Sequence, residues 1–351
     1  MYIKLIIFLV FCMCTILFAT EENVNEIFNN MEKIKLTDIY GIQLGHSHSV
    51  EGTGVSVIIC KDGATGGVAV RGGAPGTRET DLLNPMEMVQ KIHAVVLAGG
   101  SAFGLDASSG VMEYLENHNI GFDVGVAKVP IVSSAVLFDL TFGNPKIRPD
   151  KEMGLQACIN SESYNEDIQG NIGAGYGAVV GKYFGLEYSM KSGLGTSAYQ
   201  IGDLQIGAIV AVNCLGDVKN PRTNEFIAGA YDRKQHIFLN TEQLMIDNYK
   251  DLKDPFKGNT TIGIIITNAK LDKAQANKLA SMAHNGFART IYPSHTMYDG
   301  DTIFCLGTNQ VNVDITLLGM LLTNTMEQAI LNAVTNAESL KDTPSYKEIN
   351  K

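Results

Sequence analysis

Thr260 stands where a polar segment runs into an apolar one, and a threonine in that place could become a nucleophile. Residues 262–267 are mostly isoleucine, which is typical of a buried strand. If the bond between Asn259 and Thr260 breaks, Thr260 becomes a chain terminus whose hydroxyl lies beside its own α-amine, a ready general base. Such amines titrate near ~7.7–8.0, so a useful fraction is neutral at physiological pH. These residues predict a self-processing amide hydrolase.

Two simpler interpretations of the same residues stay open. Asn is common in turns and Thr in strands, so the stretch could be only a turn before a strand. Residues 259–261 also match the N-glycosylation pattern that a secreted eukaryotic chain could use. The three residues alone therefore do not establish self-cleavage.

Asp299 and Asp301 flank Gly300 in a second polar segment, residues 293–304. Two close carboxylates titrate as a pair, one of them with a raised pKa, which suits proton transfer or the binding of an ammonium group. The alternatives are an Asp-Gly turn before a strand and a fragment of a calcium loop. The calcium loop fits poorly because the full acidic spacing and the closing Glu are missing.

Two further polar residues lie among apolar or glycine neighbours. Asn213 follows the apolar run 209–212, and its amide could stabilise an oxyanion. Lys191 precedes a glycine-rich stretch, and partial burial would shift its pKa towards neutrality. The simpler interpretations are a cap at the end of a strand for Asn213 and a surface charge for Lys191.

Other candidate motifs carry less weight. Ser101 in Gly99-Gly100-Ser101 is not a nucleophile elbow, because Phe103 stands where the closing glycine must be, so we expect a turn or helix-capping residue. His46 and His48 could ligate a metal, but no second cluster supports them. We expect no metal and no cofactor.

The elements that must position these residues are short strands and a few helices. Apolar, β-branched runs predict strands at 54–59, 94–97, 207–212 and 262–267, separated by glycine-rich turns. Helices are predicted at 105–117, 271–289 and within 313–340. This order fits an α/β fold with four layers, an α/β/β/α sandwich, better than a doubly wound parallel sheet. The charged segment 219–257 ends in what we expect to be an exposed linker leading to Asn259.

Composition narrows the class of protein. Residues 1–20 carry an apolar run that predicts a secretory signal, so we expect a secreted or periplasmic protein, with a retained membrane anchor as the lesser alternative. The formal charge of −10 argues against nucleic acid as a partner. The four cysteines beyond that segment are far apart and mostly in apolar runs, which favours free thiols.

The motifs together resemble one family. In order along the chain they are residues 71–83, 97–106, 129–132, 258–263 and 299–301. This order is similar to that of the self-processing peptidases that include the L-aminopeptidase/D-esterase, the β-peptidyl aminopeptidases and the nylon-oligomer hydrolase. The resemblance implies the sandwich fold shared with ornithine acetyltransferases, and a single catalytic domain, 21–351. It also implies a cut into a larger chain, 21–259, and a smaller chain, 260–351, with assembly into homo-oligomers.

The resemblance also assigns roles. It makes Thr260 the nucleophile, Asp299 and Asp301 the acidic pair, Asn213 the oxyanion-side Asn and Lys191 the lysine of the nylon-hydrolase pattern. The implied activity is hydrolysis of aminoacyl amides, esters or short peptides. Acyl transfer like that of ornithine acetyltransferases, and an uncleaved noncatalytic binding protein, remain the alternatives. The sequence does not choose among α-peptides, β-peptides and D-amino acid esters or amides.

Overall fold

The computed structural model describes residues 26–164, 166–250 and 258–350. Its main sheet runs in the order β1-β11-β12-β17-β19-β3-β5-β8-β4, with β2 paired to β3. These strands are β1 (Glu32–Lys33), β2 (Gln43–Ser49), β3 (Thr53–Val70), β4 (Thr77–Arg78), β5 (Ile92–Ala98), β8 (Val132–Val136), β11 (Leu194–Ile201), β12 (Leu204–Asn213), β17 (Thr260–Ala269) and β19 (Thr302–Val311).

Shorter strands form small sheets at the edges. They are β6 (Phe122–Asp123), β7 (Lys128–Val129), β9 (Val179–Val180), β10 (Met190–Lys191), β13 (Asp217–Lys219), β14 (Phe226–Ala228), β15 (Tyr231–Asp232), β16 (Ile237–Phe238) and β18 (Ile291–Tyr292). The helices are α2 (Ala107–Asn117), α3 (Lys151–Ser161), α4 (Thr241–Asp247), α5 (Lys273–Thr290), α6 (Ile315–Thr335) and α7 (Tyr346–Ile349). The 3-10 turns are η1 (Glu26–Phe28), η2 (Leu36–Asp38), η3 (Asp81–Leu83), η4 (Ser101–Asp106), η5 (Gly173–Gly175) and η6 (Leu186–Tyr188).

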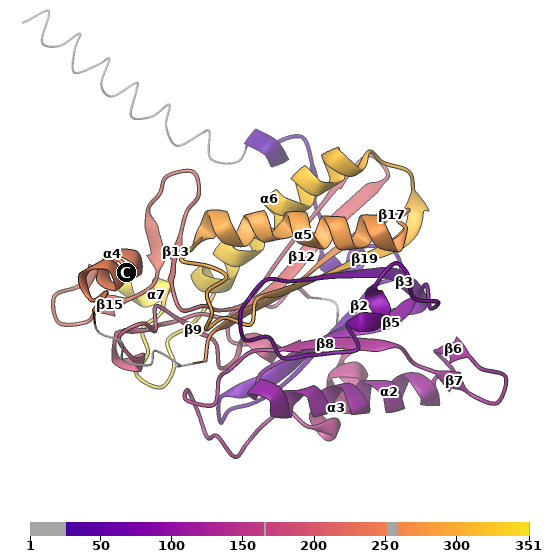
Figure 1. Ribbon diagram of the computed structural model, residues 1–351, viewed down its shortest axis with the longest axis horizontal. Helices are drawn as coiled ribbons and strands as arrows, with labels where there is room; N and C mark the ends of the chain where they lie inside the picture. Colours follow the sequence, from indigo (N-terminus) through magenta and orange to yellow (C-terminus); the bar gives the residue numbers. More distant parts are fainter. Residues whose placement is uncertain (1–25, 165, 251–257, 351) are drawn as a thin grey trace, which may run out of the picture.

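Strand β3 joins two layers of sheet. Its first part pairs with β2 and β5, for example Val57 opposite Val96, and its last part pairs with β19, for example Val68 opposite Phe304. Helices α5 and α6 cover one sheet layer and α2 and α3 cover the other, as Figure 1 shows. The chain is therefore layered helix, sheet, sheet, helix, which confirms the predicted sandwich.

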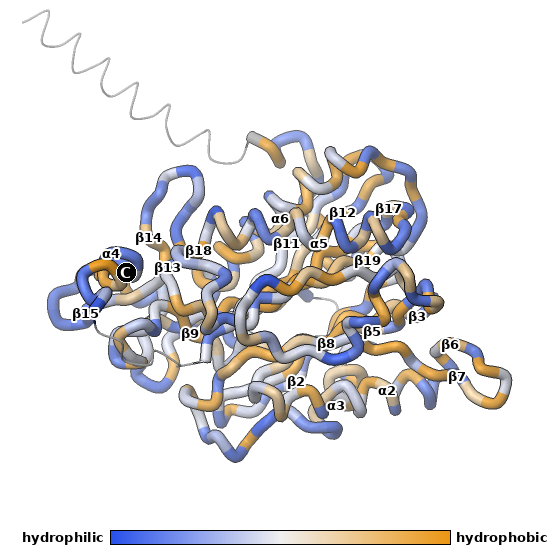
Figure 2. The backbone as a smooth tube through the Cα atoms, viewed as in Figure 1, coloured by the Kyte–Doolittle hydropathy of each residue, from blue (hydrophilic) through white to orange (hydrophobic). Residues whose placement is uncertain are grey.

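Three separate apolar clusters fill the spaces between these layers. Successive strand side chains point to opposite faces, so β17 sends Ile265 towards the helices α5 and α6, and Ile264 towards the second sheet layer. A third cluster lies between β5 and helices α2 and α3 and includes Val96 and Val111. In Figure 2 the hydrophobic colour follows the central strands, and the outer loops are mostly hydrophilic.

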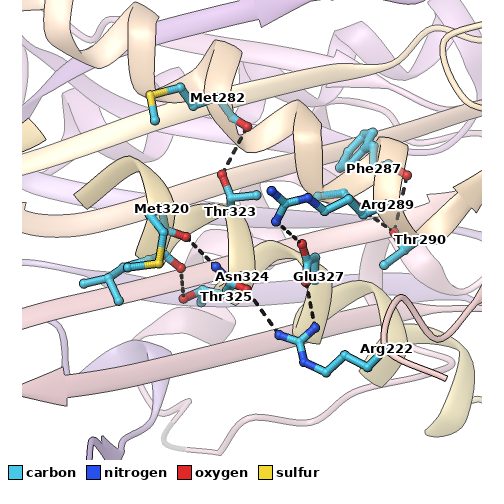
Figure 3. A network of polar contacts seen from close by, with 12 residues as sticks. Arg222, Met282, Phe287, Arg289, Thr290, Met320, Thr323, Asn324, Thr325 and Glu327 are labelled. Carbon is cyan, nitrogen blue, oxygen red and sulfur yellow. Dashed lines mark hydrogen bonds and ion pairs between the residues drawn. The ribbon is translucent and has the colours of Figure 1, made fainter. Parts of the chain in front are cut away.

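Helices α5 and α6 begin at capping aspartates. Asp272 accepts a hydrogen bond from the backbone N–H of Gln275, and Asp314 accepts one from Leu317. Near the end of α5, Arg289 donates to the buried Glu327 of α6 at 2.8 Å, and Arg222 reaches the same carboxylate at 3.3 Å (Figure 3). This ionic network ties the two helices to the loop between β13 and β14.

The predicted elements agree with the structure except at their ends. The expected helix at 105–117 begins as the 3-10 turn η4 and continues as α2, and the long helix expected within 313–340 ends at Thr335. Segment 219–257 contains β14, β15, β16 and α4 before residue 251. The expected linker before Asn259 falls largely at 251–257, outside the described residues.

The structure tests the expectation about the cysteines but not the one about the N-terminal signal. Cys60, Cys158, Cys214 and Cys305 are buried free thiols, as predicted. The expected signal at 1–20 lies outside the described residues. Within the described part of the chain, none of the helices combines the length and the apolar character that crossing a membrane requires.

Candidate active site

Thr260 is the first residue of β17, a central strand held between β12 and β19. Its side chain is buried, and its hydroxyl donates a hydrogen bond to the carbonyl oxygen of Asn259. The backbone N–H of Gly300 donates to that same oxygen at 3.1 Å and to the Thr260 hydroxyl at 3.2 Å. The hydroxyl therefore lies beside the Asn259 carbonyl group, and an N–H points at the oxygen where negative charge would form.

Asp299 lies next to this bond through a parallel β-bridge with Asn259. Its Oδ2 accepts hydrogen bonds from the backbone N–H and the hydroxyl of Thr296, whereas its buried Oδ1 has no partner among the described residues. Burial, together with the charge of Asp301, raises the pKa of Asp299 to about 6. A carboxyl group with that pKa can exchange a proton near neutral pH.

Asp301 contacts the residue that follows the candidate nucleophile. Its Oδ1 accepts the backbone N–H of Thr261 at 2.8 Å. Its Oδ2 accepts both the backbone N–H of His295, at 3.0 Å, and the ring Nδ1 of His295, at 2.8 Å. The structure therefore brings together Thr260 and both predicted carboxylates at the neighbouring ends of β17 and β19.

Asn213 is the strand partner of Thr260, because the two residues face each other in the β12–β17 register. Its side-chain Nδ2 donates to the Phe138 carbonyl at 2.8 Å, and its Oδ1 accepts the backbone N–H of Val179 at 3.1 Å. The predicted neighbourhood is present. The side-chain donor of Asn213, however, is engaged by Phe138 in the uncut chain.

The structure does not bring Lys191 into this group. Its ammonium is fully buried and donates to the carbonyls of Gly175, Ala178 and Ser192. Burial lowers its pKa to about 7, so it is not the surface charge that was the simpler alternative. Within the described chain, its ammonium donates no hydrogen bond to Asn259, Thr260 or the acidic pair.

Lys182 lies where Lys191 was expected. Its Nζ donates to the carbonyl of Asn213 at 2.8 Å and to that of Gly258 at 3.0 Å, the residue just before Asn259. Burial lowers its pKa to about 7. Sequence reasoning missed this residue, although Lys182 follows the apolar run 178–180 and so carried a sign of a buried lysine.

A small cavity of about 100 Å³ opens beside Thr260. Ser101, which has a left-handed backbone with φ +56°, lies in the turn that begins η4 and contributes to its wall. The lining residues are Ala74, Pro75, Gly76, Ser101, Ala102, Val136, Leu137, Phe138, Gly258, Asn259, Thr260 and Tyr298. A larger cleft of about 460 Å³, walled by lysines and His93, does not include Thr260.

The histidine pair has structural surroundings. His46 is buried and bonded to the Ser56 hydroxyl at 2.8 Å, and burial lowers its pKa to about 3. His48 stacks on Tyr176. Across the residues the structure describes, no group of three His, Cys, Asp or Glu side chains is arranged to hold a metal ion.

Comparisons with known proteins agree on one family. The family model of peptidase family S58 matches residues 35–346. An uncharacterised aminopeptidase of Mycobacterium leprae is 38% identical, over 89% of this chain and 92% of its own length. A 6-aminohexanoate-oligomer endohydrolase of Paenarthrobacter ureafaciens is 32% identical, over 84% of each chain.

Solved structures support the fold. The L-aminopeptidase D-Ala-esterase/amidase of Ochrobactrum anthropi, described as a variant of the Ntn hydrolase fold, matches with a TM-score of 0.65 at 18% identity over 88% of each chain. A Burkholderia β-aminopeptidase matches with a TM-score of 0.61 at 16% identity, over 90% of this chain and 91% of its own. The resemblance inferred from the motifs is confirmed, and the chain belongs to peptidase family S58, a family of hydrolases.

Proposed function

We propose that this protein is a self-processing aminopeptidase or amidohydrolase that cuts itself between Asn259 and Thr260 and then uses Thr260 as its nucleophile. The observation that carries the proposal is the contact of the Thr260 hydroxyl with the Asn259 carbonyl oxygen, on which the Gly300 N–H also converges. A nucleophile beside its carbonyl and a preorganised donor on the oxygen are the two parts that acyl transfer needs.

Self-cleavage would begin with attack of the Thr260 oxygen on the Asn259 carbonyl carbon. The hydroxyl proton passes to a nearby base, for which we assign the buried Asp299, and the Gly300 N–H stabilises the oxyanion. The C–N bond then breaks, the nitrogen takes up a proton, and an ester joins Asn259 to the Thr260 side chain. Water hydrolyses this ester and leaves a carboxylate on Asn259 and a free amine on Thr260.

Turnover would repeat this chemistry on a substrate. The new α-amine of Thr260 takes the hydroxyl proton, the oxygen attacks a substrate amide or ester, and water releases the acyl group in a second step. Lys182 would hold in place the carbonyls of Gly258, which precedes Asn259, and of Asn213, the strand partner of Thr260. Asn213 would become a donor to the oxyanion after Phe138 moves away from its amide.

The cavity beside Thr260 supports a preference for small uncharged aminoacyl groups. It holds about 100 Å³, and none of its described lining residues is Asp, Glu, Lys or Arg. A charged side chain buried there would lose its hydration without a partner. We therefore expect alanine 4-nitroanilide to be hydrolysed faster than the glutamate or lysine derivatives. Equal rates for all three would remove this preference.

The decisive experiment compares intact masses of the purified wild type and two variants. Thr260→Val removes the nucleophile with little change of shape. Thr261→Val removes a neighbouring buried hydroxyl that has no partner among the described residues, and so serves as the matched control. We expect two fragments meeting at Asn259/Thr260 in the wild type and in Thr261→Val, and one chain in Thr260→Val. An uncut wild type would favour a noncatalytic binding protein instead.

Two further proposals concern the whole chain. We propose that residues 1–20 direct secretion or periplasmic export, supported by their apolar run after Lys4. We also propose that cleaved heterodimers assemble into a homo-oligomer, supported by the family resemblance. Sequencing the N-terminus of the protein from its native source tests the first, and the native mass in solution tests the second.

A further inference from the structure

His295 belongs to the same polar segment as the acidic pair, yet the mechanism above does not use it. It lies in the loop between β18 and β19, and both its ring Nδ1 and its backbone N–H bond to the Oδ2 of Asp301, at 2.8 and 3.0 Å. The other oxygen of Asp301 accepts the Thr261 N–H at 2.8 Å. A continuous path of hydrogen bonds thus leads from His295 to the residue after the nucleophile.

The ring of His295 also packs against two aromatic rings of α5. Its centroid lies 4.8 Å from that of His284, edge to face, and 6.0 Å from that of Phe287. His284 is itself fixed by a bond of 2.9 Å between its Nε2 and the carbonyl of Ala69 on β3. Because a carbonyl only accepts, the proton of His284 is on Nε2. The ring of His295 is therefore packed in one orientation, with its Nδ1 directed at Asp301.

The backbone of His295 is unusual for a residue with a side chain. Its φ is +58°, in the left-handed region that only a few per cent of residues other than Gly adopt, chiefly Asn, Asp and His. Strained conformations of this kind persist where the surroundings hold them, and they gather at functional sites. Here the left-handed turn allows the backbone N–H and the ring N–H of one residue to reach the same carboxylate oxygen.

We propose that His295 is a positioning residue for the reaction of Thr260. By holding one oxygen of Asp301 with two donors, it leaves the other oxygen directed at the Thr261 N–H and so fixes the start of β17 against Gly300. The inference rests on the function proposed above. Without the ring, the Oδ2 of Asp301 keeps only the backbone N–H of His295 as a donor. The carboxylate can then rotate, and the Thr260 hydroxyl loses its fixed place beside the Asn259 carbonyl.

The test compares His295→Ala with His295→Asn. The Asn variant retains an N–H donor near the place of Nδ1 and tolerates the left-handed backbone. His236 supplies the matched control, because its φ is +56° and its ring contacts the Tyr231 hydroxyl in the turn between β15 and β16, away from Thr260. His236→Ala and His236→Asn therefore report the effect of the same changes on a strained histidine outside the site.

Self-cleavage is followed in time after cell-free synthesis of the full chain, and kcat and KM are measured with alanine 4-nitroanilide. We expect His295→Ala to slow self-cleavage and to lower kcat on the order of 10- to 100-fold with little change in KM, because misplacement of reacting groups costs that much. His295→Asn should recover most of the loss. The His236 variants should behave like the wild type, and all variants should unfold cooperatively on heating.

Three results would overturn the inference. Wild-type rates in His295→Ala would show that the ring is not needed. Equal losses in His295→Ala and His295→Asn would show that the retained donor does not matter. Losses of rate in His236→Ala as large as those in His295→Ala would show that replacing any left-handed histidine slows the reaction through general destabilisation. Failure of the proposed function is seen separately, because then the wild type would stay uncut or Thr260→Val would be cut like the wild type.

Discussion

The carboxyl group of Asp299 has a pKa above its ordinary value of 3.8, and this shift predicts a pH dependence of self-cleavage. Burial and the charge of Asp301 raise this pKa to about 6, so Asp299 is neutral below about pH 6 and ionised above it. Only the ionised form can accept the Thr260 proton. The rate of self-cleavage should therefore rise as the pH rises through about 6.

The measurement is a time course of precursor loss at a series of pH values. Asp299→Asn should lose the inflection near pH 6 and cleave slowly at every pH, because an amide cannot take up the proton. An inflection that survives in Asp299→Asn would assign the titration to another group.

The two buried lysines give a matched pair. Replacing Lys182 with Met leaves the carbonyls of Gly258 and Asn213 without their donor, so the segment before the cut loses its anchor. Each unsatisfied buried acceptor costs about 1–3 kcal/mol. Lys182→Met should slow self-cleavage strongly, and Lys191→Met, equally buried but bonded elsewhere, should affect stability more than the rate. The same time course and a thermal unfolding curve separate these effects, and a larger loss of rate in Lys191→Met would restore the original assignment.

Which lysine lies at the site could not be predicted from spacing. Lys182 lies two residues after β9, and Lys191 is the second residue of β10, the strand that pairs with β9. Only the packing of that pair against β12 decides which ammonium meets the Gly258 carbonyl. Thr260 and the carboxylates, in contrast, lie at the starts of parallel neighbours, β17 and β19, so the direction of two adjacent strands is enough to bring them together.

Helices α5 and α6 are joined by a buried carboxylate that two arginines share (Figure 3). The side chain of Glu327 is 4% exposed, whereas Glu338 in the surface pair with Lys347 is 66% exposed. Glu327→Gln keeps the shape and removes the charge that both arginines contact. Hydrogen bonds to charged groups contribute about 1.5–3 kcal/mol, so a loss of that size in the free energy of unfolding is expected.

Glu338→Gln is the control for this loss. Exposed ion pairs contribute about 0–1 kcal/mol, so the control should unfold almost like the wild type. Urea unfolding of both variants, made in the Thr260→Val background so that every chain is uncut, measures the difference. Similar stabilities for the two variants would mean that the buried network adds nothing.

Among the elements that the sequence predicted, β3 departs most from its expected bounds. The apolar run at 54–59 predicts a strand, but the strand continues to Val70 through the exposed, charged residues Lys61 and Asp62. Hydrophobic periodicity fails there because the strand leaves one sheet layer and enters the other. The helices 271–289 and 105–117 were predicted well because each buries one regular apolar face.

In the whole molecule, strands from before and after the Asn259–Thr260 bond pair with one another, so a cut there would not separate the two parts. Strands β17 and β19, which follow that bond in the sequence, pair with β12 and β3, which precede it. The two fragments should elute together in buffer and separate only in denaturant. After dilution from denaturant, the cut protein should recover its activity at a rate that depends on protein concentration. Refolding of uncut Thr260→Val, followed by circular dichroism, should not depend on it. Independence of concentration for the cut chain would contradict this.

Because Thr260 is buried at the start of a central strand, the chain would have to fold before it is cut. The new chain end would lie inside the sheet, so the residues on either side of the cut must reach their places while they are still one molecule. Joining the ends of one chain costs less entropy than bringing two chains together. The cut enzyme would then keep a fold that only the uncut precursor reaches readily. The two separated chains would refold to it less readily than the single chain does.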